Sequence, residues 1–469
     1  MLNRKLLLKS KNIKLKLFQC LTSLSAGEGL RVWLFIFTLF FLFTSCSISK
    51  QISKQANKFL LQDSIISHGN IGISIYEPAT NKYWYNYQAE KYFVPASNTK
   101  LFSLYAGMKY LGDSLPAFKY AVDKNLIIIE PTGDPSFLHP DFKLQRAFTF
   151  LKQINKPVII INNNWKENAL GYGWAWDDYT SSDMVERNAL PIYGNLIKWI
   201  QIKDKPAESK LEGNLVYSEP NVNWKIIFND DTVRNNFNVT RNRNENVYQI
   251  TFGKEKRKEI QIPFVTNGTE TTTELLKDTL NLPVSIITST LYKSFTTLYS
   301  QPSDSLFTLM MHRSDNFFAE QTLLMASNEK LGYMSDAKMI EYLLNNDLKD
   351  IPQKPRWVDG SGLSRYNLFS PKDFVFILQK LKNDFGLERL KVILPTGGTG
   401  TLSSLYKKDS GFVFAKTGTL SNHVALSGFL ITKKNKLLIF SILPGNFIGA
   451  PTPVRKAIEK FLLNIRQRY

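Results

Sequence analysis

The sequence predicts an α+β fold in which a central α/β or β-rich region separates two segments of helices and hairpins. Three observations support this prediction. Residues 47–114 contain a strand hairpin followed by a long helical pattern, and residues 291–469 contain helices, a second hairpin and a final helix. Between them, residues 115–290 change to short apolar runs separated by turns. We therefore expect three segments, with the middle one forming a region of its own.

The first segment has the clearest local patterns. After Ser97, apolar residues recur at helical spacing until Gly112 interrupts them, so we expect a core helix to begin near Ser97. The patterns before this helix predict, in order, an amphipathic helix over residues 51–66, a strand over 71–77, a turn at 78–81 and a strand over 83–87.

The middle segment is harder to divide. Apolar runs at 126–129 and 157–161 predict strands, and a polar stretch rich in Asn and Lys extends from 203 to 275. Residues 173–178 (Gly-Trp-Ala-Trp-Asp-Asp) form an aromatic and acidic cluster. Such a cluster either binds sugar or peptide or forms a structural corner, and the second interpretation is the commoner one.

The last segment returns to helical spacing. Helical patterns before and after residues 314–316 place a Ser-Asp-Asn sequence at a junction between two helices. The other predicted elements are glycine-rich turns at 359–362 and 395–400, a strand over 412–415, a hairpin of strands 424–431 and 437–443, and an amphipathic helix over 453–466.

Charge and cysteine content limit the possible partners. The net charge of +19 favours anionic partners such as wall polymers or lipid headgroups, although a solvated lysine-rich surface explains it equally well. No nucleic-acid-binding motif is present, so we expect no nucleic-acid partner. The only cysteines are Cys20 and Cys46, and the four histidines are scattered. We therefore predict no metal site and no other cofactor.

Residues 1–46 have the features of an export signal. A basic stretch over residues 1–31 precedes an unbroken apolar run over 32–43, which is short for a membrane span but typical of a signal-peptide core. Small residues then lead to Cys46, as in bacterial lipoprotein signals, so we expect acylation of Cys46 after cleavage. An uncleaved anchor is the alternative. In each case the chain is predicted to be exported to the periplasm and anchored in a membrane.

A possible nucleophile and base lie at the start of the predicted core helix. Ser97 and Lys100 are three residues apart, which places both side chains on one helix face. A serine hydroxyl needs a base to become nucleophilic, and a lysine whose pKa is lowered by burial can be that base. The spacing alone has little weight, because it also occurs at Ser47/Lys50, Ser327/Lys330 and Ser404/Lys407.

Two further motifs make the Ser97 pair significant. Ser314-Asp315-Asn316 follows it, and Lys416-Thr417-Gly418-Thr419 comes next, with Lys-Thr-Gly occurring once in the chain. These three motifs in this order are typical of penicillin-binding proteins and class A β-lactamases. The sequence resembles the serine DD-peptidases of the low-molecular-mass penicillin-binding type, in particular the S13-type D-alanyl-D-alanine carboxypeptidase/endopeptidase family, which has a large insertion after the first motif.

The resemblance extends from about residue 60 to the end of the chain and implies a fold and an activity. The implied fold is that of serine β-lactamases and DD-peptidases, an antiparallel sheet flanked by helices and split by the insertion. The implied activity is cleavage of peptidoglycan stem peptides ending in D-Ala-D-Ala, with β-lactams as inhibitors. The shared residues outside the three motifs are Gly133-Asp134-Pro135, Trp174, Trp176, Asp177, Phe317 to Glu320, Asp359 to Ser364 and Leu420.

The resemblance also implies a role for each motif residue. Ser97 would attack the scissile carbonyl, Lys100 would take its proton, and Ser314 would pass a proton to the leaving amine. Backbone N–H groups of Ser97 and Thr419 would form the oxyanion hole. Asp315 would brace the helix junction. Substrate binding would fall to Asn316 for the substrate amide and to Lys416, Thr417, Gly418 and Thr419 for the terminal carboxylate.

Two other functions remain open on sequence alone. A β-lactamase needs a deacylating Glu with an Asn, and Glu341 and Asn345 have that order, but they lie in a pattern that favours a plain helix. Tyr193-Gly194-Asn195 is an alternative second motif that lacks flanking helices. The last alternative is a non-catalytic wall-binding lipoprotein of the same fold, which the presence of all the proposed catalytic side chains disfavours.

Overall fold

The computed structural model describes residues 48–203, 215–229, 235–288 and 294–469. The chain divides into two units, residues 1–58 and residues 59–469. Within the first unit, residues 48–56 are helical. The predicted export signal and Cys46 lie outside the described residues. None of the helices in the described ranges combines the length and the apolar character that a membrane span requires.

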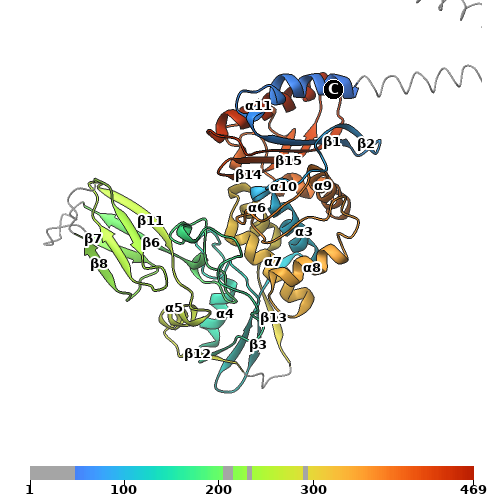
Figure 1. The fold of residues 1–469 in the computed structure, drawn as a ribbon. Coiled ribbons are helices and arrows are strands. Elements are labelled where there is room, and N and C mark those ends of the chain that lie inside the picture. Colours follow the sequence, from blue (N-terminus) through green and yellow to red (C-terminus); the bar gives the residue numbers. More distant parts are fainter. Residues whose placement is uncertain (1–47, 204–214, 230–234, 289–293) are drawn as a thin grey trace, which may run out of the picture. The chain divides into compact units, whose positions relative to one another are not determined.

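Both ends of the second unit build one antiparallel sheet (Figure 1). Strand β1 pairs with β16 in a register that places Ile73 opposite Ile442, so residues far apart in sequence become neighbours. The two predicted hairpins are present as β1–β2 and β15–β16. In sheet order the strands are β14 (Val413–Leu420), β15 (His423–Ile431), β16 (Leu437–Gly445), β1 (Asn70–Glu77) and β2 (Lys82–Tyr87).

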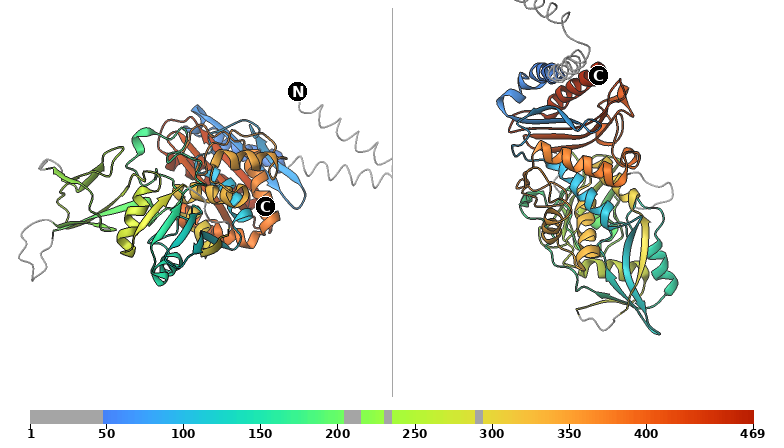
Figure 2. Two further views of the ribbon diagram at one scale, coloured as in Figure 1. Left: turned by 90° about the horizontal axis from the view of Figure 1, so that it is seen from below. Right: turned by 90° about the vertical axis from the view of Figure 1, so that its right-hand side faces the viewer.

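Helices cover both faces of this sheet. Helix α11 (Pro451–Arg468) packs on one face and α9 (Pro371–Phe385) on the other (Figures 1 and 2). Because both faces are covered, β15 and β16 are apolar along most of their length rather than alternating. Strand β14 lies at the edge of the sheet, where Thr396 bridges Phe414 and the carbonyl oxygen of Pro395 accepts from the backbone N–H of Ala415. Beyond Ala415, the described part of the chain places no strand on this outer side of β14.

Two buried helices form the centre of the helical layer. Helix α3 (Lys100–Tyr110) packs against α7 (Asn316–Leu331), and nearly every residue of α3 is buried. A helix that is buried on all sides belongs to a core rather than to a surface. Phe102 of α3 contacts the rings of Phe369 and Phe374. Helices α6 (Ser303–Arg313) and α8 (Asp336–Asn345) pack against this pair, and α10 (Leu387–Ile393) packs against α6 and α9.

The middle of the chain forms a second five-stranded sheet. Strands β3 and β13 pair antiparallel and carry the chain into and out of this region, while β4, β5 and β12 run parallel to one another. Its apolar core includes Phe118 and Phe264. The sheet order is β12 (Val284–Ile287), β5 (Val158–Ile161), β4 (Ile127–Pro131), β3 (Ser114–Val122) and β13 (Thr296–Pro302), with helices α4 (Arg146–Ile154) and α5 (Glu270–Leu280).

Two small sheets complete the middle region. They share an apolar core around Trp199 and Tyr248 (Figure 1). These two small sheets are β-rich, whereas the five-stranded sheet and its helices form a mixed α/β part. The limits predicted for the inserted region, residues 115–290, stay a prediction. One sheet has the order β11 (Arg257–Pro263), β6 (Leu196–Ile202) and β7 (Leu215–Glu219), and the other β8 (Ile226–Asn229), β10 (Tyr248–Thr251) and β9 (Asn238–Arg241).

Short helical turns join these elements. They are η1 (Asn57–Leu61), η2 (Ile66–His68), η3 (Ala96–Thr99), η4 (Trp176–Asp178), η5 (Tyr193–Asn195), η6 (Gly400–Leu402) and η7 (Lys407–Asp409).

Candidate active site

Ser97 lies in the turn η3, directly before α3. The residue before it, Ala96, is fully buried and has a φ of +48°, a conformation that residues other than Gly rarely adopt. Gly362 packs directly against this turn. The approach is so close that a Cβ at position 362 would lie 1.9 Å from the carbonyl oxygen of Ala96. The predicted glycine-rich turn at 359–362 therefore packs directly against the turn that carries Ser97.

Lys100 is fully buried at the first position of α3. Its Nζ lies 2.9 Å from Ser97 Oγ, 2.6 Å from Asn316 Oδ1 and 2.7 Å from the carbonyl oxygen of Ser361. Burial lowers the pKa of Lys100 to about 8. The nearby carboxylates act in the opposite direction and raise this pKa, and Asp359 has the largest effect among them. A substantial fraction of the amine is therefore neutral near physiological pH and able to accept a proton.

Lys416 forms a second buried amine next to Lys100. Its Nζ lies 2.8 Å from Ser314 Oγ and 2.7 Å from the carbonyl oxygen of Thr417. Burial and then the charge of Lys100 lower the pKa of Lys416 well below its usual value. An incoming carboxylate would favour the charged form of Lys416 again.

The Ser-Asp-Asn motif forms the junction between α6 and α7, as its flanking patterns predicted. Ser314 has a φ of +62° and ends α6. The carboxylate of Asp315 accepts a hydrogen bond from the backbone N–H of Phe318 at 2.9 Å and so caps α7. Burial raises the pKa of Asp315. This geometry agrees with a bracing role for Asp315.

The strand β14 closes the site on its other side. Asn98 joins the Ser97 turn to the sheet, since its amide donates to the carbonyl oxygen of Lys416 and accepts from Ser427 Oγ. At Gly418 the backbones come so close that a Cβ would lie 2.7 Å from the carbonyl oxygen of Pro95 and 3.1 Å from the backbone nitrogen of Ser97. Only glycine fits there, and β14 thereby passes directly beside the nucleophile.

The three motifs are thus brought together, but Asn316 has partners that the sequence did not indicate. Its Oδ1 accepts from Lys100, and its Nδ2 donates to the carbonyl oxygen of Asp183 at 2.8 Å. Asp183 belongs to the middle region of the chain. Because the amide nitrogen has two hydrogens, Asn316 Nδ2 can keep its bond to the Asp183 carbonyl and also donate to a substrate amide, as predicted.

A buried network behind Lys100 was not predicted. Asp359 accepts hydrogen bonds from the backbone N–H of Gly362 at 2.8 Å and from Trp174 Nε1 at 3.0 Å. Trp174 therefore fixes the 359–364 loop, which favours the structural interpretation of the aromatic cluster. Trp176 of the same cluster is 65% exposed. Glu320 accepts from the backbone N–H of Ser361 at 2.7 Å, and Ser361 is the residue whose carbonyl contacts Lys100.

Arg187, in the middle region, is a cation that pairs with the acidic side chain of Glu320 in this network. Its guanidinium is buried and lies 3.1 Å from Glu320, with Asp336 and Glu167 as further partners. Burial and Asp359 raise the pKa of Glu320, and Arg187 opposes this rise. An unpaired charge at this depth would be strongly unfavourable, so the ions stabilise one another. No local pattern marks Arg187, because its partners are far away in sequence.

Arg455 is another residue that the sequence did not indicate. It lies on α11, and its Nη2 donates a hydrogen bond to Thr419 Oγ1 at the exposed end of β14. Burial lowers the pKa of Arg455, although a guanidinium stays protonated at any relevant pH. A cation thus lies beside the threonine predicted to meet the substrate carboxylate.

The side chains considered for the alternative functions lie elsewhere. Glu341 is an exposed residue of α8 that pairs with Lys338 at 2.9 Å. Asn195 is buried, and its amide is engaged by the backbone of Ile192 and Glu186. Among the residues that the structure describes, no group of His, Cys, Asp and Glu side chains is arranged to hold a metal ion.

Comparison with known proteins identifies the family of the chain. Residues 53–466 match the D-Ala-D-Ala carboxypeptidase 3 (S13) family. The chain belongs to this family. The penicillin-sensitive carboxypeptidase A of Dictyostelium discoideum is 22% identical in an alignment of 441 positions that covers 79% of this chain and 81% of that protein. This S13 chain is therefore a serine D-Ala-D-Ala carboxypeptidase, a hydrolase, as the motifs predicted.

Solved structures confirm the predicted fold class. Penicillin-binding protein 4 of Haemophilus influenzae superposes with a TM-score of 0.69 at 18% identity, over 89% of this chain and 99% of that one. The same protein in complex with a β-lactam gives a TM-score of 0.66 at 17% identity. The antiparallel sheet flanked by helices is the architecture that the resemblance implied. The roles of individual site residues stay predictions.

The position of Lys100 predicts the pH dependence of acylation. A lysine accepts a proton only when neutral, and its lowered pKa of about 8 means that the neutral fraction rises as the pH rises through that value. We expect the second-order rate constant for acylation by a fluorescent penicillin to rise from about pH 6 to about pH 9, with its midpoint near 8, and to level off above. Spontaneous hydrolysis of the penicillin at each pH is the blank. A profile that is flat, or that falls across this range, would contradict the assignment of Lys100 as the base.

Proposed function

We propose that this S13 carboxypeptidase removes D-Ala from peptidoglycan stem peptides through an acyl-enzyme on Ser97. The observation that supports this most directly is the 2.9 Å contact between Ser97 Oγ and the buried Nζ of Lys100. Ser97 Oγ forms a bond to the penultimate D-Ala carbonyl carbon while its proton passes to neutral Lys100. The C–N bond then breaks, and Ser314 passes a proton to the leaving amine. Water hydrolyses the ester and restores Ser97.

The negative charge that develops on the carbonyl oxygen during acylation is stabilised by hydrogen-bond donors that are already in position. The backbone N–H groups of Ser97 and Thr419 are the proposed oxyanion hole, and one such donor contributes about 10²–10³ in rate. The close approach of Gly418 to Ser97 supports this proposal because it brings the two backbones side by side. A larger residue at position 418 would separate them.

The outer edge of β14 from Lys416 onward suits an extended peptide. A stem peptide that adds to this edge as a further strand would place its terminal carboxylate near Lys416, Thr417 and Thr419. Lys416 would be charged in that complex, because a carboxylate beside it raises its pKa. Arg455, already bonded to Thr419 Oγ1, would supply a second cation to the same carboxylate.

β-Lactams are the proposed inhibitors, as acyl donors to Ser97. The description of the Dictyostelium relative as penicillin-sensitive and the β-lactam complex of the Haemophilus protein support this step. A β-lactamase would also need a base for rapid deacylation. Glu341, the candidate for that task, is an exposed surface residue, which favours a long-lived adduct.

Export to the periplasm and membrane anchoring at Cys46 belong to the same proposal. Their support is the basic and apolar pattern of residues 1–46 and the location of the proposed substrate, which is a wall polymer outside the cytoplasm. The substrate class is the peptidoglycan stem peptide ending in D-Ala-D-Ala, cleaved either at a free end or at a cross-link.

Replacing the nucleophile tests the proposed chemistry. The Ser97→Ala variant should form no adduct with fluorescent penicillin and should lose about 10⁶ in kcat, because the other two oxygens beside Lys100 Nζ are an amide oxygen and a backbone carbonyl oxygen, neither of which can replace the hydroxyl. Labelling on denaturing gels and D-Ala release from a pentapeptide provide the two measurements.

The matched control is Ser404→Ala, which removes an exposed serine of another Ser-x-x-Lys sequence and should label as the unchanged protein does. A Ser97→Ala protein that still labels would refute the assignment of Ser97.

Replacing Arg455 tests the carboxylate site. We expect Arg455→Gln to lower kcat/KM for a pentapeptide with a free C-terminal carboxylate by about tenfold or more, the usual effect of losing one hydrogen bond to a charged group. Steady-state release of D-Ala measures this. The same loss on a substrate with an amidated C-terminus would show that Arg455 does not contact the carboxylate. Arg468→Gln, an exposed arginine of the same helix, is the control and should change neither rate.

A further inference from the structure

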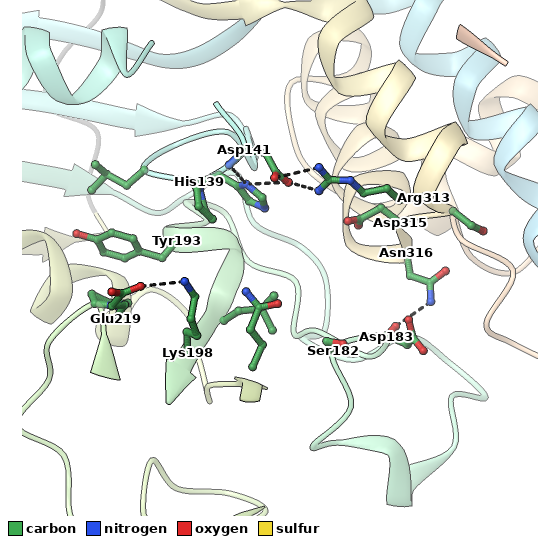
Figure 3. A pocket seen from close by; sticks show the side chains of 16 residues that line it. His139, Asp141, Ser182, Asp183, Tyr193, Lys198, Glu219, Arg313, Asp315 and Asn316 are labelled. Carbon is green, nitrogen blue, oxygen red and sulfur yellow. Dashed lines mark hydrogen bonds and ion pairs between the residues drawn. The ribbon is translucent and has the colours of Figure 1, made fainter. Parts of the chain in front are cut away.

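A cavity of about 600 Å³ adjoins the Ser-Asp-Asn motif (Figure 3). This volume is within the usual range for ligand sites. One wall comes from the α6–α7 junction, and the others come from the middle region of the chain. The residues that matter for its chemistry are His139, Asp141, Tyr193, Lys198, Glu219, Arg313 and the motif residues Ser314 to Asn316. The middle region therefore builds a pocket that shares the Ser-Asp-Asn motif with the candidate active site.

The pocket carries charges of both signs. Arg313 pairs with Asp141, and Lys198 pairs with Glu219 at 2.9 Å; the two pairs lie on different sides of the pocket (Figure 3). The side chains of Arg313 and Lys198 are 51% and 29% exposed, so a ligand can reach both. Burial lowers the pKa of His139 to about 4, which leaves this side chain neutral. Such a lining suits a ligand that has both amino and carboxylate groups.

Backbone strain is concentrated around this pocket. Among the described residues, six that are neither Gly nor Asn have a positive φ, and Leu138, Tyr193 and Ser314 all line the pocket. A bulky residue such as Tyr193 rarely adopts this conformation, because it is sterically unfavourable. Conformations of this kind persist where the surroundings enforce them, often at ligand-binding sites. The surrounding structure therefore keeps these residues of the pocket in backbone conformations that they would otherwise rarely adopt.

The pocket is continuous with the side of the active site from which the leaving group departs. Ser314, the proposed proton donor to the leaving amine, lines the pocket and is bonded to Lys416 Nζ at 2.8 Å. Asn316, which also lines it, contacts Lys100. Whatever is attached to the leaving amine must extend past Ser314. In a pentapeptide this is a single D-Ala, and in a cross-linked dimer it is a second peptide.

We propose that this pocket binds the second peptide strand of a cross-linked stem-peptide dimer, with Lys198 and Glu219 as residues that determine specificity. This inference rests on the proposed function of Ser97. The bond that breaks is again the amide of the acyl D-Ala, and the leaving amine belongs to the second strand and takes its proton through Ser314. Charged walls favour a peptide with free amino and carboxylate groups over a neutral sugar.

The test compares two substrates with the full chain: a monomeric disaccharide pentapeptide and a cross-linked dimer. We expect Lys198→Gln and Glu219→Gln each to raise the KM for the dimer by about tenfold more than the KM for the monomer, as loss of a hydrogen bond to a charged group predicts. Lys258→Gln, an exposed lysine on the adjacent strand β11, is the control and should shift neither. Labelling by fluorescent penicillin verifies that each variant has a folded active site.

The outcomes separate this inference from the function on which it rests. Equal changes in KM for both substrates, or no change in a variant that still labels, would overturn the role of the pocket. So would an unchanged protein that labels and releases D-Ala from the monomer but does not cleave the dimer. If removing the disaccharide from the monomer raises KM as much as the pocket substitutions do for the dimer, the occupant is the glycan and the peptide proposal is wrong. Absence of labelling in the unchanged protein would instead refute the proposed function.

Discussion

The burial of Lys100 is the constraint on which the rest of the site depends. An ammonium group with no access to water is strongly disfavoured, and this lowers its pKa toward the range in which the neutral amine can accept a proton. The same burial demands that every hydrogen bond of the amine be made within the protein, and Ser97, Asn316 and Ser361 meet that demand. Each of these partners comes from a different stretch of chain. The site is therefore possible only if α3, the α6–α7 junction and the 359–364 loop all pack around one nitrogen atom.

The middle region of the chain takes part in this packing. Trp174 binds Asp359, Arg187 binds Glu320, and the carbonyl oxygen of Asp183 accepts from Asn316. Arg187 and Glu320 are both buried, and removing Arg187 would take away the cation that pairs with Glu320, whereas Arg187 would keep Asp336 and Glu167 if Glu320 were removed. The middle region thus forms its own sheets and also contacts the loops and helices that build the candidate active site. Its contacts reach the residues that hold Lys100, so a change in its position would be transmitted to the base.

Local pattern explains what the sequence predicted well. The helix after Ser97, the junction at Ser314 and the hairpin that follows β14 depend on periodicity and on turn residues within one stretch, and the structure has all three. The pairing of β1 with β16 has no such signal, since its partners lie at opposite ends of the sequence. The same is true of Arg187 and Arg455, whose importance comes from distant side chains. Charged residues in polar surroundings look alike in a sequence until the fold shows which of them are buried and paired.

Two residues beside the reacting groups have strained backbone conformations that the rest of the fold maintains. Ala96 precedes the nucleophile and Ser314 is the proposed proton donor, and both have a positive φ that costs about 1–3 kcal/mol for such residues. Each is fixed by a specific neighbour: Gly362 packs against the carbonyl oxygen of Ala96, and Asp315 caps the helix that begins after Ser314. Relaxing either residue to an ordinary conformation would rotate a catalytic hydroxyl away from its lysine. The buried pair α3 and α7 opposes that relaxation, because the helices cannot shift without opening the core between them. Dense packing of these two helices is therefore a condition for the chemistry as well as for the fold.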